Sequence, residues 1–319
     1  MTEFYPQKMI TGSEITIVGT NFDPIASNNV VKINGVVAKV NSATATTLAI
    51  TIPTAATSGK ITVNKGAVAA TSSNDFMVMN NPYQNVRIKY ITTIETKIRR
   101  LFHYDSSNRL TSIETCLMDN LGTLNIQSIN TYTYLPDGKL DKDTYKIISP
   151  ASNTSTVDQY TYVGNVLDKI TNSTIDETTA SSPIVTINSI EKYDFIKGSI
   201  NTITRTDSQG KILFINKYAY AIIAGNPQIV LTQTPGPGSG GGVSSRTTLY
   251  SGDVLNPLSL TIPTVQESLF FEKSYAFSQI ADDYTFFPAL NQETGRITDA
   301  YFYINKITKA TQNYQYEDK

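Results

Sequence analysis

Short runs in which apolar and polar residues alternate recur along most of the chain, and turn-forming residues separate them. The first run, at residues 14–19, reads Glu-Ile-Thr-Ile-Val-Gly, and similar runs lie at 30–33, 47–53, 60–63 and 75–78. Alternation with a period of two places the apolar side chains on one face of a β-strand. No segment keeps an apolar period of 3.6 residues over three turns with caps at both ends, so we predict an all-β fold.

The overall charge and the scarcity of metal-ligating residues exclude several classes of protein. The 319 residues include 26 Lys and Arg against 27 Asp and Glu, so no excess charge favours a nucleic-acid or membrane partner. No apolar run approaches the roughly 20 residues of a membrane helix. The single Cys116 excludes an internal disulfide, and the single His103 excludes a zinc site built from several Cys or His ligands. We therefore expect no metal and no cofactor.

The turns of the first eighty residues carry a more specific pattern. Gly19-Thr20-Asn21-Phe22 follows the first run, and Asn34-Gly35, the favoured pair for a two-residue hairpin, follows the second. With the run at 47–53 and the closing 76–78, these residues resemble the IPT/TIG family of immunoglobulin-like domains. The resemblance implies an Ig-like sandwich over residues 1–80 that serves as a spacer or docking module in surface and carbohydrate-active proteins. Some family members bind DNA, but the few lysines here are well spread, so we expect no nucleic-acid partner.

The pattern of residues changes after Asn80-Asn81-Pro82. This segment marks a boundary because an Asn-Pro pair stops a strand. We assign residues 81–85 to a linker and 86–319 to a second domain. There, aromatic residues two apart precede successive turns, at Phe102/Tyr104, Tyr132/Tyr134, Tyr160/Tyr162, Tyr193/Phe195 and Tyr218/Tyr220. Each turn leads into another strand, which predicts a long antiparallel β-meander, either a curved open sheet or a partial barrel.

Two of these hairpins suggest a second resemblance. Residues 102–110 and 132–140 are similar to degenerate YD repeats, as found in RHS proteins and in surface lipoproteins of the Bacteroidetes type. The resemblance implies a β-hairpin repeat domain of a surface protein. Physically, paired aromatics on one face stack against the next hairpin, so that each repeat buries what it cannot bury alone.

The motifs that could carry chemistry have simpler structural explanations. Residues 235–242 contain three glycines in GxGxxG spacing, but the next residues start a strand rather than the helix of a dinucleotide site, so we predict a flexible surface loop. His103 lies between Phe102 and Tyr104 in a strand pattern, and Cys116 fits a buried small apolar residue. No Gly-x-Ser-x-Gly elbow is present.

The acidic residues also lack a metal-binding or catalytic arrangement. Asp137, Asp141 and Asp143 do not have EF-hand spacing, and Asp282-Asp283 stands alone. We expect Asp137 to cap a turn and the others to lie on solvated strand faces. Carboxylates for glycoside hydrolysis would have to come from distant strands, so an enzyme such as a glycoside hydrolase or lyase remains a third alternative behind two non-catalytic functions.

Aromatic residues near the C-terminus break the one-faced pattern. In residues 296–304, Tyr301 and Tyr303 share a strand face with Asp299, and the pairs Phe270-Phe271 and Phe286-Phe287 place aromatics on both faces. Either a second layer covers these rings, or they form a stacking platform for a ligand such as a sugar. The candidate ligand-binding residues are Tyr284, Phe287, Tyr301 and Tyr303.

These observations predict a non-catalytic cell-surface binding protein whose partner is a polysaccharide or a surface protein. Residues 1–6 lack the basic and apolar regions of a signal peptide, so the protein is either intracellular or has lost a leader. The Thr- and Asn-rich surface and the first module favour the second, with contact to a membrane only through a removed N-terminal lipid anchor. The alternative is a purely structural or adhesive surface protein without a small-molecule ligand.

Overall fold

A computed structural model gives the fold of the chain. It describes all residues except 6, 80, 149, 151, 165, 179–182, 197–198, 224–225, 239–240, 256–273, 280–283, 291, 294–295 and 305–306. For some strand residues, namely 196, 199, 220–223, 226–229, 246–255, 274–279, 284–290, 298, 300–304 and 307–309, it describes the backbone only. No helix in the described part of the chain is long and apolar enough to cross a membrane.

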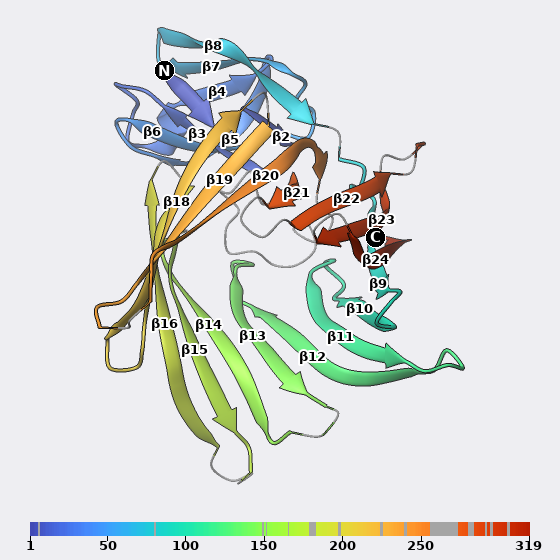
Figure 1. Cartoon of the computed structure of the whole chain (residues 1–319). Helices are drawn as coiled ribbons and strands as arrows, with labels where there is room; N and C mark the ends of the chain where they lie inside the picture. Colours follow the sequence, from blue (N-terminus) through green and yellow to red (C-terminus); the bar gives the residue numbers. More distant parts are fainter. Residues whose placement is uncertain are drawn as a thin grey trace. The chain divides into compact units, whose positions relative to one another are not determined.

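The chain forms two compact units, of which the first comprises Met1–Asn81 and the second starts at Pro82 (Figure 1). Within the first unit, the structure has one 3-10 turn, η1 (Ala26–Asn28), and eight strands: β1 (Glu3–Tyr5), β2 (Lys8–Ile10), β3 (Glu14–Val18), β4 (Val30–Ile33), β5 (Val36–Ala43), β6 (Thr47–Thr51), β7 (Gly59–Lys65) and β8 (Val68–Met79).

Strand β5 connects the two halves of the first unit. Its start pairs with β4 and its end with β6, with an irregularity between Val40 and Ser42. The strand order is β1-β3-β6-β5-β4-β7-β8-β2. The alternating residues of these strands meet in one core, in which Ile17, Leu48 and Phe76 are fully buried. The predicted Ig-like architecture is confirmed.

The second unit is one antiparallel sheet, in which each strand pairs with its neighbours in the sequence. Its strands are β9 (Val86–Thr93), β10 (Ile98–Tyr104), β11 (Leu110–Met118), β12 (Leu124–Tyr134), β13 (Leu140–Ile147), β14 (Thr154–Val163), β15 (Val166–Asp176), β16 (Ile184–Ile196), β17 (Ser199–Thr206), β18 (Ile212–Ile223), β19 (Asn226–Pro235), β20 (Ser244–Leu255), β21 (Ser274–Gln279), β22 (Tyr284–Leu290), β23 (Ile297–Ile304) and β24 (Ile307–Asp318).

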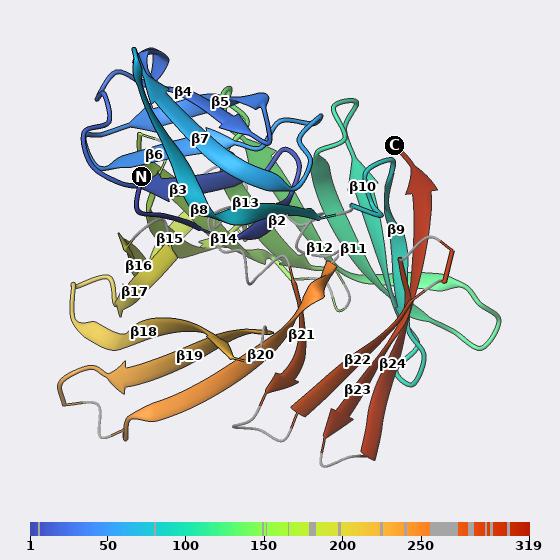
Figure 2. The same cartoon turned by 90° about the horizontal axis from the view of Figure 1, so that it is seen from above.

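The sheet closes on itself, because the last strand pairs with the first. The register joins Asp318 to Val86 and Gln312 to Thr93, and Figure 2 shows β24 beside β9. The sequence left a curved open sheet and a partial barrel as alternatives. The pairing of β24 with β9 makes the sheet a closed barrel, in which neither terminal strand keeps an unpaired edge.

The hairpins share a turn and a bulge. Asn108 and Gly138 have positive φ values of 60° and 89°, which only glycine and asparagine adopt readily. Just before each turn the register shifts by one residue, at His103/Tyr104 and at Thr133/Tyr134. Such bulges strengthen the local twist and re-aim side chains.

The most buried cluster of the second unit lies at the end of the barrel that carries these turns. It contains Ile88, Leu110 and Ile297, each at most 1% exposed, with Tyr104 and Tyr316 packed against it. Residues 82–85, which we predicted as linker, contact the same end: the Ile297 backbone N–H donates to Tyr83 Oη at 3.0 Å. This segment is therefore held by the second unit.

The start of the glycine-rich segment differs from the predicted flexible loop. The Gly236 backbone N–H donates to the Leu213 carbonyl oxygen at 2.8 Å, and a Cβ added at Gly236 would lie 1.8 Å from the Ile212 carbonyl oxygen. Gly236 is thus required for close backbone packing against β18. Around Gly238 and Gly242, by contrast, nothing lies within 4 Å of an added Cβ.

Candidate functional site

Four tyrosines at the end of the barrel that carries the β10–β11 and β12–β13 turns have a shared structural role, which we call the tyrosine clasp. Each tyrosine lies among the last three residues of its strand, and its hydroxyl donates to the carbonyl oxygen of an aliphatic residue among the first three of the preceding strand. The bonds are Tyr104 to Ile88 (2.7 Å), Tyr134 to Leu110 (2.7 Å), Tyr162 to Leu140 (2.9 Å) and Tyr316 to Ile297 (2.8 Å). A clasp therefore ties two strands together at the end where no turn connects them.

A cation covers the ring in three of the clasps. The guanidinium carbons of Arg87 and Arg109 lie 4.4 and 4.8 Å from the ring centroids of Tyr104 and Tyr134, and Lys139 Nζ lies 5.2 Å from that of Tyr162. Each cation directly precedes the aliphatic residue that accepts the tyrosine bond. The rings and hydroxyls of these tyrosines are thus engaged in holding the sheet together.

A different group of side chains crosses the middle of the sheet. Five residues on neighbouring strands are directly opposed in register, so they lie on one face and form what we call the polar row: Tyr132, Asp143, Asp158, Asn172 and Ser189. Directly opposed side chains on adjacent strands lie within reach of one another. The polar row therefore brings an aromatic ring, two carboxylates, an amide and a hydroxyl together.

Hydrogen bonds orient the members of the polar row. Tyr160 Oη donates to Asp143 Oδ2 at 2.7 Å, and Asn172 Nδ2 donates to Asp158 Oδ1 at 2.6 Å. Asn188 Nδ2 donates to the other side of the Asn172 amide, at Oδ1, over 3.0 Å. These bonds use one oxygen of each aspartate, which leaves the second oxygen of each as an acceptor for another group.

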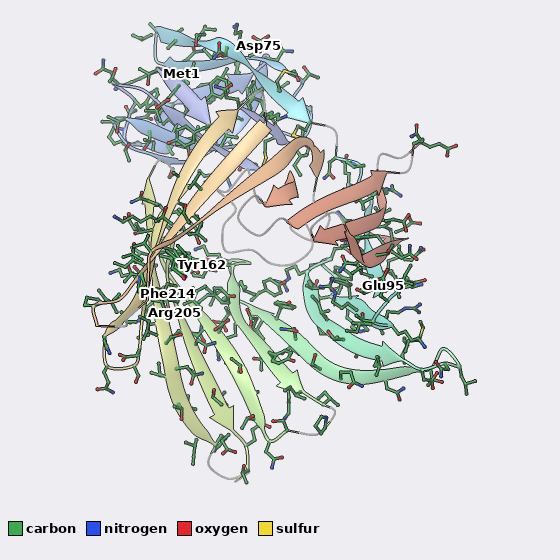
Figure 3. All side chains as sticks on the ribbon, viewed as in Figure 1. Met1, Asp75, Glu95, Tyr162, Arg205 and Phe214 are labelled. Carbon is green, nitrogen blue, oxygen red and sulfur yellow. The ribbon has the colours of Figure 1, made fainter. Side chains whose placement is uncertain are left out.

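An ion pair continues the polar surface beyond the row. Arg205 Nε lies 3.0 Å from Glu191 Oε1, and Tyr193 Oη donates to Glu191 Oε2 at 3.0 Å. The Arg205 guanidinium carbon also lies 5.3 Å from the ring centroid of Phe214. Figure 3 labels both residues. Glu191 is paired with this arginine, whereas Asp143 and Asp158 form no ion pair within the described part of the chain.

The two aspartates and their tyrosine have a common electrostatic pattern. Burial, with a smaller contribution from the charge of Asp158, raises the pKa of Asp143. Burial and the neighbouring Asp143 also raise the pKa of Tyr160, so its hydroxyl keeps its proton and donates. The sequence predicted Asp143 on a solvated strand face; it is instead half-buried and hydrogen-bonded.

The other residues considered for chemistry lie where no reaction centre forms. His103 is exposed on β10, with Nε2 3.4 Å from Glu114 Oε2. Cys116 is buried, as predicted, and burial raises the pKa of its thiol. Asp137 caps its turn by accepting from the Lys139 backbone N–H at 3.1 Å, which is also as predicted. Among the described residues, no group of three or more His, Cys, Asp or Glu side chains could hold a metal ion.

The predicted aromatic platform lies on the paired strands β22 and β23. The register places Phe287 opposite Tyr301 and Thr285 opposite Tyr303, while Tyr284 is opposite Ile304. The side chains of Tyr284, Phe287, Tyr301 and Tyr303 lie outside the described residues, as do Phe270-Phe271 and Asp282-Asp283. The platform therefore remains a prediction.

Sequence reasoning missed the polar row, because its members are polar residues of ordinary strands and only the register of five strands brings them together. The clasps left a clearer signal, namely a basic residue followed by Leu or Ile directly after a turn. This signal occurs at Arg109-Leu110, Lys139-Leu140 and Arg296-Ile297.

Comparison with known proteins identifies the first unit. The model of the IPT/TIG domain matches residues 1–78, about a quarter of the chain, so this part of the protein is an IPT/TIG domain. No curated protein sequence matches the chain.

Several solved structures are similar at low sequence identity. A porin-like protein from Bacteroides uniformis is 13% identical, with a TM-score of 0.45 over 74% of this chain and 98% of that one. A porin-like protein from Bacteroides vulgatus is 11% identical, with a TM-score of 0.43 over 73% and 99%. An auxiliary nutrient binding protein from Bacteroides thetaiotaomicron is 12% identical, with a TM-score of 0.24 over 73% and 66%. With TM-scores below 0.5, these similarities say nothing about what this protein binds.

Proposed function

We propose that this is a non-catalytic cell-surface binding protein in which the IPT/TIG domain acts as a spacer and the second unit binds a glycan. The observation that carries the proposal is the polar row, which places two carboxylates and an amide beside the Tyr132 ring on one face. Sugar hydroxyls bind through such acceptors and donors, and sugar rings pack against aromatic faces. The predicted location at the cell surface, with a lipid anchor upstream of the present sequence, belongs to the same proposal.

A glycan array tests this function on the intact chain. We expect a signal that Asp158→Ala and Asn172→Ala abolish, because these residues supply the acceptor and donor atoms of the row. Asp137→Ala, which removes only a turn-capping carboxylate, should retain the signal. The absence of any signal on a broad array would contradict the proposal, provided that circular dichroism shows folded protein.

The same array separates the two candidate sites. If Tyr301→Ala and Tyr303→Ala remove the signal while Asp158→Ala does not, the aromatic platform of β22 and β23 is the binding site. A loss with Asp158→Ala alone assigns binding to the polar row.

A purely structural or adhesive protein is the second candidate, and the tyrosine clasps favour it. Their rings and hydroxyls contribute to the sheet itself and need no ligand. The clasps also support the proposed relation to YD repeats, since they give successive hairpins a common construction. A glycan array without signal, together with a stable, monomeric protein, would favour this candidate.

A further inference from the structure

The two ends of the second unit differ in their exposed apolar residues. Turns β9–β10, β11–β12, β13–β14 and β15–β16 lie at one end, because consecutive strands are antiparallel. Exposed aliphatic residues at these four tips form what we call the apolar rim: Ile94, Leu117, Leu121, Ile147, Ile148, Ile184, Val185 and Ile187. At the opposite end, the described turns β10–β11, β12–β13 and β14–β15 expose only Val163 and Val166 among large apolar residues.

Residues of the apolar rim are exposed on both faces of the sheet. Ile184 and Val185 are consecutive residues of β16 and so point to opposite faces, yet they are 63% and 60% exposed. Leu121, at the β11–β12 tip, is 93% exposed. A protein packed on the inner or the outer face would cover only one of each such pair. An apolar phase into which the tips insert would cover both.

The apolar rim is also shallow. Further from the β15–β16 tip, Thr174 is opposite Thr186 and Ser173 is opposite Ile187, and beyond Ile187 the polar pair Asn172 and Ser189 follows. The tips can therefore enter an apolar layer by only a few ångströms, as in proteins that lie in the lipid interface, where apolar groups insert about 5–10 Å.

Several of the charged side chains beside the apolar rim have hydrogen-bond or ion-pair partners. Lys146 Nζ lies 2.6 Å from Glu177 Oε2, and Lys97 Nζ donates to Asn120 Oδ1 at 2.6 Å. Asp119 Oδ1 accepts from the backbone N–H groups of Leu121 and Thr123, both at 2.8 Å. The charged residues at the four tips are Lys97 and Lys146 against Glu95, Asp119, Asp176 and Glu177, a formal charge of −2. This charge disfavours an anionic lipid surface and leaves an electrically neutral one.

We propose that the apolar rim inserts into the interfacial layer of a zwitterionic lipid membrane. This contact is independent of the glycan proposal and would add to the lipid anchor that the sequence predicted as the sole membrane contact. Each inserted aliphatic side chain adds a hydrophobic contribution, and because a zwitterionic surface carries no net charge, salt should change the binding little.

The absence of tryptophan from the chain permits a direct test. In the full-length Leu121→Trp variant, the single tryptophan should shift its emission to shorter wavelength on addition of phosphatidylcholine vesicles, and brominated acyl chains should quench it. The matched Val163→Trp variant, at a site 69% exposed at the other end, should show neither change. An unchanged Leu121→Trp spectrum, or equal changes in both variants, would overturn the proposal.

Flotation with the same vesicles tests the unlabelled chain. We expect the wild-type chain to float, Ile184→Asp to reduce partitioning about tenfold, and Val166→Asp to leave it unchanged. Both substituted residues are exposed, so neither change opens the core. Failure of the wild-type chain to float would overturn the proposal. So would a vesicle-independent dimer, seen by light scattering, that Ile184→Asp dissociates, because the apolar rim would then bind a second copy of the chain.

Discussion

The two units of this protein bury their side chains in different ways. In the IPT/TIG domain, two sets of strands cover each other, and residues such as Ile17, Leu48 and Ile61 reach 0% exposure without special contacts. The second unit is a single closed sheet. Among its described residues, complete burial is concentrated at the end that carries the β10–β11 and β12–β13 turns. Where a second layer is absent, tyrosine clasps and side-chain hydrogen bonds hold the strands together. Aliphatic packing alone is enough to hold the strands together only where two layers of strands face each other.

This difference also divides the second unit along its strands. One end has the buried cluster with its clasps, the middle has the half-buried polar row, and the other end exposes the apolar rim. Polar groups that are half-buried need partners, which the polar row supplies. The exposed aliphatic residues concentrated at the other end are the feature on which the proposed membrane contact rests.

The largest effect is expected in the core of the IPT/TIG domain. Phe76 is fully buried and makes an edge-on contact with Phe4, with ring centroids 6.1 Å apart. Phe76→Ala should lower the free energy of unfolding of this domain by about 4 kcal/mol, because it leaves a cavity that the two layers cannot close. Urea unfolding measures this, with Val68→Ala, at a residue 73% exposed, as the control. A loss below about 1 kcal/mol would show that the core is not packed as described.

A smaller but still clear effect is expected at Gly236 in the second unit. Gly236→Ala should destabilise the protein by about 2 kcal/mol, because the added Cβ meets the Ile212 carbonyl oxygen and β18 must shift. Gly242→Ala, where the space is open, should change the stability by less than about 0.5 kcal/mol. Equal values for the two variants in thermal unfolding would mean that the whole segment is a free loop.

Removal of one tyrosine clasp should cost about 1 kcal/mol. Tyr134→Phe keeps the ring under Arg109 but leaves the Leu110 carbonyl without its donor, which costs about 0.5–1.5 kcal/mol. Tyr145→Phe, at a residue 40% exposed, is the matched control and should be neutral. If chemical denaturation shows no difference between the variants, the clasps do not substitute for a second layer.

The smallest effect is a pair of opposite pH dependences. Burial raises the pKa of Asp143, so its contribution to stability is present below the unfolded pKa and is lost as the pH rises through the folded pKa. Hydrogen bonds from Lys139 lower the pKa of Asp137, so its contribution is present above the unfolded pKa and is lost as the pH falls through the folded pKa.

Two asparagine variants separate these contributions. Between about pH 3 and pH 7, Asp143→Asn should gain stability relative to the wild type as the pH rises, whereas Asp137→Asn should lose it. Thermal unfolding across this range measures both. The same sign for the two variants would contradict the half-buried placement of Asp143.

Local sequence features predicted much of the fold. The alternation of residues 14–19, the Asn34-Gly35 hairpin and the turn glycines act over a few residues, so the strands and turns they form can be read directly. The same holds for His103, Cys116 and the capping role of Asp137. The sequence predicted a flexible loop over the whole glycine-rich segment. Only the tertiary structure, in which β18 lies against Gly236, shows that this glycine is packed.

The sequence by itself determined an all-β chain, an IPT/TIG-like domain over about residues 1–80 and a meander of hairpins with aromatic residues before their turns, because these depend on periodicity and turn chemistry within short segments. Only the tertiary structure decided that β24 pairs with β9, that bulges set the tyrosine clasps, and that Tyr132, Asp143, Asp158, Asn172 and Ser189 share one row. Those features depend on register across several strands, and a one-residue bulge in any strand changes which side chains meet.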